Sequence, residues 1–161
     1  MMHISRLKVR VTINITRMLY NLVSYRFLDH MTDAYIEVQG STLEQVFELA
    51  AKALVDTMVN VSTVAQISEE QITVEGHDLE SLLYNWLEAV MLKLLVDKQT
   101  LSYFKVYISK HDDKYELKAT VRGEPFDVEK HKYKVEIKGV TYHMMQIEQN
   151  GTVKARFLLD L

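Results

Sequence analysis

The amino-acid sequence predicts an α+β fold, in which two amphipathic helices pack on an antiparallel or mixed β-sheet. Apolar residues recur at helical spacing over 43–59 and 79–96, and they alternate with polar residues over most of the remaining chain. The resulting order, strand–helix–strand–helix followed by four strands, is typical of α+β domains. The 161 residues include one Pro and five Gly, and they are enough for one domain with a sizeable core.

Residues 1–24 are predicted to be an N-terminal extension of a domain that spans 25–161. Over 8–15 the extension alternates polar and apolar side chains, which is typical of a strand, and Met18 offers an alternative start. Because chain termini are commonly poorly ordered, we expect the extension to be loosely held.

The first core strand is predicted over 34–38 and ends at Gly40. Ser41 and Glu44 then fit a capping box, in which the Ser oxygen accepts from the Glu N–H and the Glu side chain reaches back. The first helix follows over 43–59.

A short strand over 71–75 precedes Asp78, which is a good N-cap for the second helix over 79–96. The apolar stripe of this helix is broad, so we expect it to be buried on a sheet. Its members are Leu79, Leu82, Leu83, Trp86, Leu87, Val90, Met91 and Leu94.

Four further strands are predicted over 101–109, 115–121, 140–149 and 152–159. Asn150-Gly151, between the last two, is the strongest short hairpin signal in the chain. Gly123-Glu124-Pro125 interrupts the alternation, and the charged segment 126–138 is expected to be a long, solvated excursion with some strand.

The composition excludes several classes of protein. The chain has no Cys, so disulfides, thiolate zinc sites and cysteine nucleophiles are ruled out, and a reducing cytoplasm suits it. No apolar run approaches the roughly 20 residues that span a bilayer. Residues 1–30 carry five Lys/Arg and one Asp/Glu, whereas 31–161 carry 14 and 21. An acidic main body argues against broad, nonspecific nucleic-acid binding and suits a cation site or a basic protein partner.

Three acidic groups stand at strand ends: Asp33 before the first core strand, Asp160 at the end of the last, and the α-carboxylate of Leu161. Such hard oxygen ligands select Ca²⁺, Mg²⁺ or Mn²⁺ over zinc. The groups meet only if the two strands are neighbours, which their spacing does not determine. On the residues alone, the plainer interpretation is better supported: Asp33 caps a turn and Asp160 is solvated at a frayed end.

Three further polar residues lie near the same strand ends. His30 and His143 are candidate nitrogen ligands or acid–base groups near neutral pH, and Lys138 is a candidate contact for a phosphate or a partner carboxylate. Local hydrogen bonding or solvation is the commoner role for each. The sequence contains no G-x-G-x-x-G, P-loop, G-x-S-x-G or H-E-x-x-H string, so nothing in it looks like a complete catalytic site.

Five segments occur in a fixed order along 25–161: Phe27-Leu28-Asp29-His30-Met31-Thr32-Asp33-Ala34, Gly40-Ser41-Thr42-Leu43-Glu44, Asp78-Leu79-Glu80-Ser81-Leu82-Leu83-Tyr84-Asn85-Trp86-Leu87, Lys138-Gly139-Val140-Thr141-Tyr142-His143 and Asp160-Leu161. In this order and spacing they resemble the archease family. The sequence departs from that family at Met31 and Gly139, where Ala is usual, and in having the extension 1–24.

The resemblance implies a concrete function. Archeases assist an RtcB-type RNA ligase, a GTP- and metal-dependent enzyme that joins the RNA ends left by tRNA splicing. They speed the transfer of GMP onto the ligase and allow many turnovers. The resemblance thus implies a cytoplasmic accessory protein that is not itself the ligase, with the ligase as partner and no direct contact with nucleic acid or membrane.

The resemblance also implies site residues. The family's metal ligands fall at Asp33 and Asp160, with the terminal carboxylate of Leu161 beside them, so the expected cofactor is a divalent cation such as Ca²⁺, Mg²⁺ or Mn²⁺. Lys138 matches a position that the family needs for activity, and His30 and His143 are added as candidate partner or activity residues.

Two other functions remain open at this point. One is a stand-alone metal-dependent phosphoester hydrolase that uses the two His and the two Asp of the strand ends. The other is a chaperone-like module that binds partners through its sheet and needs no ion.

Overall fold

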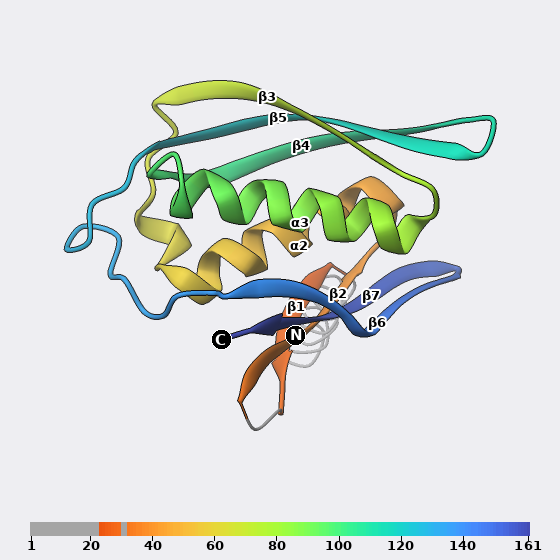
Figure 1. Cartoon of the computed structure of the whole chain (residues 1–161), viewed down its shortest axis with the longest axis horizontal. Coiled ribbons are helices and arrows are strands. Elements are labelled where there is room, and N and C mark those ends of the chain that lie inside the picture. The colour runs from red at the N-terminus through yellow and green to blue at the C-terminus, as the bar shows by residue number, and fades with distance from the viewer. Residues whose placement is uncertain (1–22, 30–31) are drawn as a thin grey trace, which may run out of the picture.

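Two helices lie between two antiparallel β-sheets in the computed structural model, which describes residues 23–29 and 32–161 (Figure 1). One sheet has the strand order β1-β2-β7-β6 and the other β3-β5-β4. The strands are β1 (Ser24–Leu28), β2 (Asp33–Gly40), β3 (Ser68–Gly76), β4 (Gln99–His111), β5 (Lys114–Pro125), β6 (Gly139–Asn150) and β7 (Thr152–Asp160). The predicted α+β class is confirmed, with two sheets in place of one. The strand suggested over 8–15 lies outside the described residues.

The helices α2 (Leu43–Met58) and α3 (Leu79–Leu95) form the middle layer, and a short 3-10 helix, η1 (Val61–Thr63), follows α2. Each helix contacts strands of both sheets, α3 packing on β3 and β4 on one side and on β6 on the other. This arrangement explains the broad apolar stripe of α3, because two of its sides must be buried. Trp86 is fully buried, and its indole N–H donates to the carbonyl oxygen of Phe47 at 2.9 Å, which joins α3 to α2.

The helix caps agree with the sequence in one case and differ in the other. Asp78 caps α3 as predicted, its carboxylate accepting from the Ser81 N–H at 2.7 Å. The predicted Ser41–Glu44 capping box is wrong by one residue, because α2 begins after Thr42, whose hydroxyl accepts from the Gln45 N–H at 3.2 Å. Thr42 and Gln45 satisfy the same spacing rule as Ser41 and Glu44, so the pattern alone does not choose between them.

The main differences from the predicted strands are the presence of β1 and the length of β5. Strand β1 was not predicted, because it is held by pairing with β2, which the local pattern does not reveal. The predicted break at Gly123-Glu124-Pro125 is also wrong, since β5 continues to Pro125. A Cβ on Gly123 would lie 1.9 Å from the carbonyl oxygen of Thr100, so the glycine permits a close approach of two strands and does not end one.

The segment between β5 and β6 contains no strand and is firmly attached to the middle layer. The backbone N–H of Asn60 donates to the carbonyl oxygen of His131, and that of Lys134 donates to Met58, both at 2.8 Å. His131 is fully buried, contrary to the solvated excursion that its charged neighbours predict. Its Nδ1 accepts from the Asp127 N–H at 2.9 Å, so its Nε2 carries the hydrogen that Glu124 accepts at 2.7 Å.

The hairpin β6–β7 confirms the Asn150-Gly151 signal, and Gly151 adopts a φ of +80° at the turn. The ladder is regular at both ends of the hairpin but shifts register between Thr141 and Gln146 on β6. Among the described residues, no helix is long and apolar enough to cross a membrane.

Candidate metal site at the ends of strands β2 and β7

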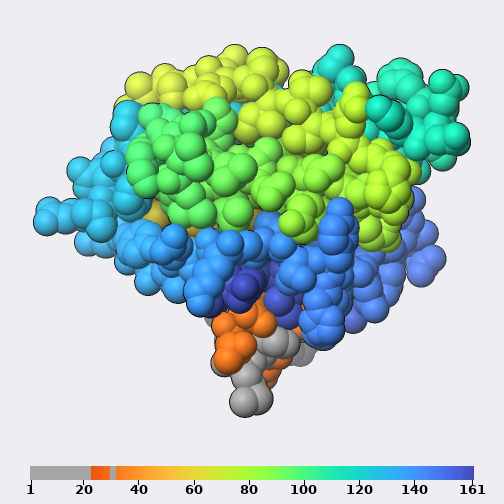
Figure 2. Space-filling view, viewed as in Figure 1, coloured from red at the N-terminus to blue at the C-terminus, as the bar shows by residue number. Residues whose placement is uncertain are grey.

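Asp33 and Asp160 lie opposite each other where β2 begins and β7 ends, as direct Cα partners in the antiparallel ladder. Direct partners carry side chains on the same face with Cβ atoms roughly 4.5–5.5 Å apart. Gly139, the first residue of β6, pairs with Asp160 from the other side. In Figure 2 the darkest blue atoms, at the end of the chain, lie between the lighter blue of the β6 region and the orange of β2. We call this end of the three strands the acidic tip.

Lys138 also lies at the acidic tip. Its backbone N–H donates to the carbonyl oxygen of Asp160 at 2.7 Å, and Lys138 is exposed to solvent. The structure therefore brings together three of the candidate residues that the sequence singles out, although they come from both ends of the domain.

Of the two candidate histidines, the structure describes only His143. His30 lies outside the described residues. His143 is exposed in the irregular stretch of β6, where no Cα partner on β7 faces it, and its N–H donates to the Thr141 hydroxyl at 3.1 Å. The geometry gives His143 a local hydrogen bond and no direct position beside the two carboxylates.

The donor set fits a hard divalent cation in part. Asp33 and Asp160 contribute carboxylate oxygens, which Ca²⁺, Mg²⁺ and Mn²⁺ prefer. Residues 23–29 and 32–161 contain no group of three or more His, Cys, Asp or Glu side chains that could hold a metal ion. Leu161 follows Asp160 and packs against the core. Its terminal carboxylate is the third oxygen donor that the family resemblance implies. Most of the six to eight positions around a Ca²⁺ would then belong to water or to another molecule.

A second charged cluster lies on the face of this sheet that points away from the helices, which we call the outer face. Ala34, Ile36 and Val38 of β2 enter the core, so the alternate residues of the strand lie on the outer face. There Glu37 accepts from Nε of Arg26 at 3.0 Å and from Nε of Arg156 at 2.7 Å.

Sequence reasoning missed this cluster. Arg26 is 11 positions and Arg156 is 119 positions from Glu37 along the chain, so no local motif contains all three. The one available signal was the regular alternation of polar and apolar residues over 33–39, which predicts a polar outer face but not its partners.

Comparison with known proteins decides the family. The model of the archease protein family matches residues 25–161. The chain belongs to the archease family. The protein archease of Pyrococcus furiosus is 45% identical over 135 residues, which make up 83% of this chain and 95% of that one. The protein archease of Sulfolobus acidocaldarius is 37% identical over 141 residues, which make up 87% of this chain and 100% of that one.

A solved structure agrees with the fold of this archease. The solution structure of Methanobacterium thermoautotrophicum protein 1598 superposes with a TM-score of 0.73 at 38% identity, covering 86% of this chain and 99% of that chain. The family match includes both ends of the acidic tip, because residues 33 and 160 lie within 25–161.

Proposed function

We propose that this archease is an accessory protein of an RtcB-type, GTP-dependent RNA ligase in tRNA splicing, and that it acts in the cytoplasm. It promotes guanylylation of the ligase and multiple turnover by positioning a divalent cation, Ca²⁺, Mg²⁺ or Mn²⁺, at the acidic tip. Membership of the archease family supports the general role. The observation that carries the proposal is the direct pairing of Asp33 with Asp160.

Electrostatics favours a cation at this position. Like charges directly opposite each other in an antiparallel ladder destabilise it, and a divalent cation between the two carboxylates removes that repulsion. When bound, the cation supplies positive charge that can neutralise phosphate oxygens at a ligase active site. Asp33 and Asp160 hold it with few ligands, so donors of the partner can complete its shell.

The shape of the acidic tip supports an accessory role. Small-molecule sites are usually concave and enclose most of their ligand, whereas Asp160 and Lys138 are exposed at the end of a sheet. An exposed tip is suited to entering a cleft of another protein. Lys138 is held at Asp160 by its backbone N–H, and its exposed side chain is then available to a phosphate or a carboxylate of that partner.

The test is multiple-turnover RNA ligation by the RtcB-type ligase of the same organism, with and without this archease. Asp33→Asn and Asp160→Asn change charge with little change in size, and Asp113→Asn, in the distant β4–β5 turn, is the matched control. We expect both tip variants to lose most of the stimulation and the control to retain it, with thermal melts confirming that all three variants are folded.

The same assay separates the other two functions. Full stimulation by both tip variants would support a chaperone-like module that needs no ion. Metal-dependent phosphoester hydrolysis by the purified protein alone, abolished by Asp33→Asn, would support a stand-alone hydrolase. Either result would overturn the proposed function.

A further inference from the structure

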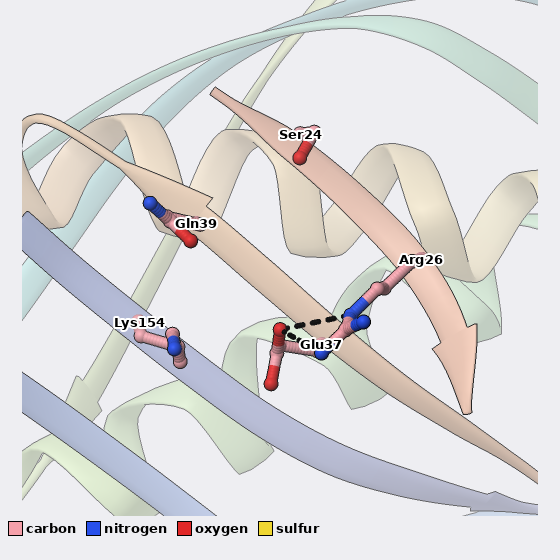
Figure 3. A pocket seen from close by; sticks show the side chains of 5 residues that line it. All are labelled: Ser24, Arg26, Glu37, Gln39 and Lys154. Carbon is pink, nitrogen blue, oxygen red and sulfur yellow. Dashed lines mark hydrogen bonds and ion pairs between the residues drawn. The ribbon is translucent and has the colours of Figure 1, made fainter. Parts of the chain in front are cut away.

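A polar pocket of about 280 Å³ opens on the outer face, away from the acidic tip (Figure 3). We call it the outer pocket. It is lined by Ser24 and Arg26 of β1, Glu37 and Gln39 of β2, and Lys154 of β7. Figure 3 shows these side chains on three neighbouring strands, with Arg26 and Glu37 directed toward each other.

Strand register builds the outer pocket. Arg26 pairs with Glu37, and Glu37 pairs with Arg156, so these three form one row across the strands. Two residues further along each strand, Ser24, Gln39 and Lys154 form the next row. Because direct partners share a face, both rows place their side chains on the outer face.

Glu37 orients the basic side chains of the pocket. Its side chain is only 7% exposed, and it holds Arg26 through two nitrogens, Nε at 3.0 Å and a terminal nitrogen at 2.9 Å. Its other oxygen accepts from Nε of Arg156 at 2.7 Å. Burial alone would raise the pKa of Glu37, but the hydrogen bonds from Arg156 and Arg26 outweigh it and hold the pKa below its usual value. Glu37 is therefore a fixed anion at neutral pH.

The guanidinium groups keep donors for a further ligand. Each guanidinium carries five N–H groups, and Glu37 takes two nitrogens of Arg26 and one of Arg156. The Arg26 side chain lines the pocket and is 66% exposed, so its remaining donors are within reach of a molecule there. The Arg156 side chain, which is bound to Glu37, is 35% exposed. Guanidinium groups recognise phosphate with parallel hydrogen bonds.

The charge balance of the pocket favours an anion. The five lining residues carry two cations and one anion, and Arg156 adds a third cation behind Glu37. Glu148 on β6 is the direct partner of Lys154 and reduces this positive excess by one charge. The excess of positive charge is local, in a chain with a formal net charge of −3.

The arrangement of donors favours phosphate over carboxylate. A carboxylate is planar and is matched best by donors that lie in one plane, as along one edge of a guanidinium. The remaining donors, from Arg26, Lys154, Ser24 and Gln39, come from three strands and two rows. Donors that approach from several directions match the tetrahedral oxygens of a phosphate group. A free or terminal phosphate also carries a second negative charge, whereas a carboxylate and a phosphodiester carry one.

We propose that the outer pocket binds a phosphate group, supplied by a free phosphate or nucleotide or by the backbone of an RNA strand. Glu37 lies four residues from Asp33 along β2, or roughly 13 Å in an extended strand, so this site is separate from the acidic tip. The proposal goes beyond the proposed function and does not depend on it, because it concerns the archease alone.

The experiment is a titration of the isolated, full-length protein with pyrophosphate, GTP and a short single-stranded RNA, followed by amide NMR shifts and by calorimetry. The test variant is the double substitution Arg26→Gln/Lys154→Gln. The control is Lys118→Gln/Arg122→Gln on β5, which removes the same charge from two residues that are also paired with Glu. Thermal melts establish that both variants fold.

We expect phosphate probes to shift amides of β1, β2 and β7 around the pocket, with affinity at least roughly tenfold weaker in the test variant and unchanged in the control. Binding of pyrophosphate and GTP would assign a free phosphate or nucleotide, whereas binding of RNA alone would assign backbone phosphodiesters. For RNA, the test variant should also have a shallower dependence of affinity on salt concentration than the control.

Three results would overturn the proposal. The first is no binding of any phosphate probe by the wild-type protein at millimolar concentration. The second is equal loss in the test and control variants, since the effect would then be one of net charge. The third is binding of a tri-glutamate peptide as tightly as pyrophosphate, which would make the pocket a general site for carboxylates.

Discussion

Asp33 and Asp160 face each other as direct partners of the β2–β7 ladder, at the end of the sheet where β6 also begins. Strand pairing thus places two carboxylates together that are distant in the sequence. In a buffer that contains no divalent cation, their charges repel. We predict that Asp160→Asn raises the free energy of unfolding by a few tenths of a kcal/mol in EDTA. Urea unfolding measures this, and Asp113→Asn should change it little; a lower stability for Asp160→Asn would contradict the account.

Two glycines should differ sharply in their tolerance of a methyl group. A Cβ on Gly123 would meet the Thr100 carbonyl oxygen at 1.9 Å, whereas a Cβ on Gly139 meets no atom within 4 Å. We expect Gly123→Ala to destabilise the protein by about 3 kcal/mol or more, and Gly139→Ala to be close to neutral. Thermal or urea unfolding of the two variants checks the pair, and similar losses in both would contradict the close strand approach.

Trp86 should contribute to stability by both packing and hydrogen bonding. Its side chain is fully buried between the layers, and its N–H donates to Phe47 at 2.9 Å. Trp86→Phe leaves a cavity and removes that donor, at an expected cost of about 2–3 kcal/mol. Unfolding followed by circular dichroism measures the loss, with Tyr107→Phe at an exposed position as the control. A cost below about 0.5 kcal/mol would show that the indole is not held as described.

Glu124 should make the stability depend on pH in the acid range. Hydrogen bonds from the Ala65 N–H, Lys130 and His131 lower the pKa of Glu124 from 4.5 to about 2. Because the folded-state pKa is depressed, the stabilisation is complete above pH 4.5 and is lost as the pH falls toward 2. Glu124→Gln should therefore reduce the fall in unfolding free energy across this window, while Glu116→Gln on the same strand should not. Identical pH profiles for wild type and Glu124→Gln would refute this assignment.

Periodicity predicted the elements whose stability is local. Helix α3 was predicted to within one residue, because its apolar stripe and the Asp78 cap are both contained in the segment itself. The β6–β7 hairpin was predicted for the same reason, since Asn150-Gly151 fixes the turn. Strand β1 was missed because it depends on β2, and the second sheet was missed because a broad helical stripe does not say how many layers cover it.

The candidate site was predictable only through the family resemblance. Asp33 and Asp160 are ordinary acidic residues at strand ends, and their meeting depends on the β2–β7 pairing, which no local pattern encodes. The burial of His131 escaped prediction for a related reason. Its neighbours in the sequence are charged, and the contacts that hold it, from Glu124 on β5 and from Asn60 after α2, are not revealed by a local pattern.

The central claim is that Asp33 and Asp160 together hold a divalent cation. The most direct measurement is a calorimetric titration of the isolated protein with Mn²⁺ and with Ca²⁺, comparing wild type, the double variant Asp33→Asn/Asp160→Asn and the control Asp113→Asn. The account predicts one site in the wild type and the control and none in the double variant. Equal binding in the double variant, or no binding by the wild type at millimolar concentration, would contradict it.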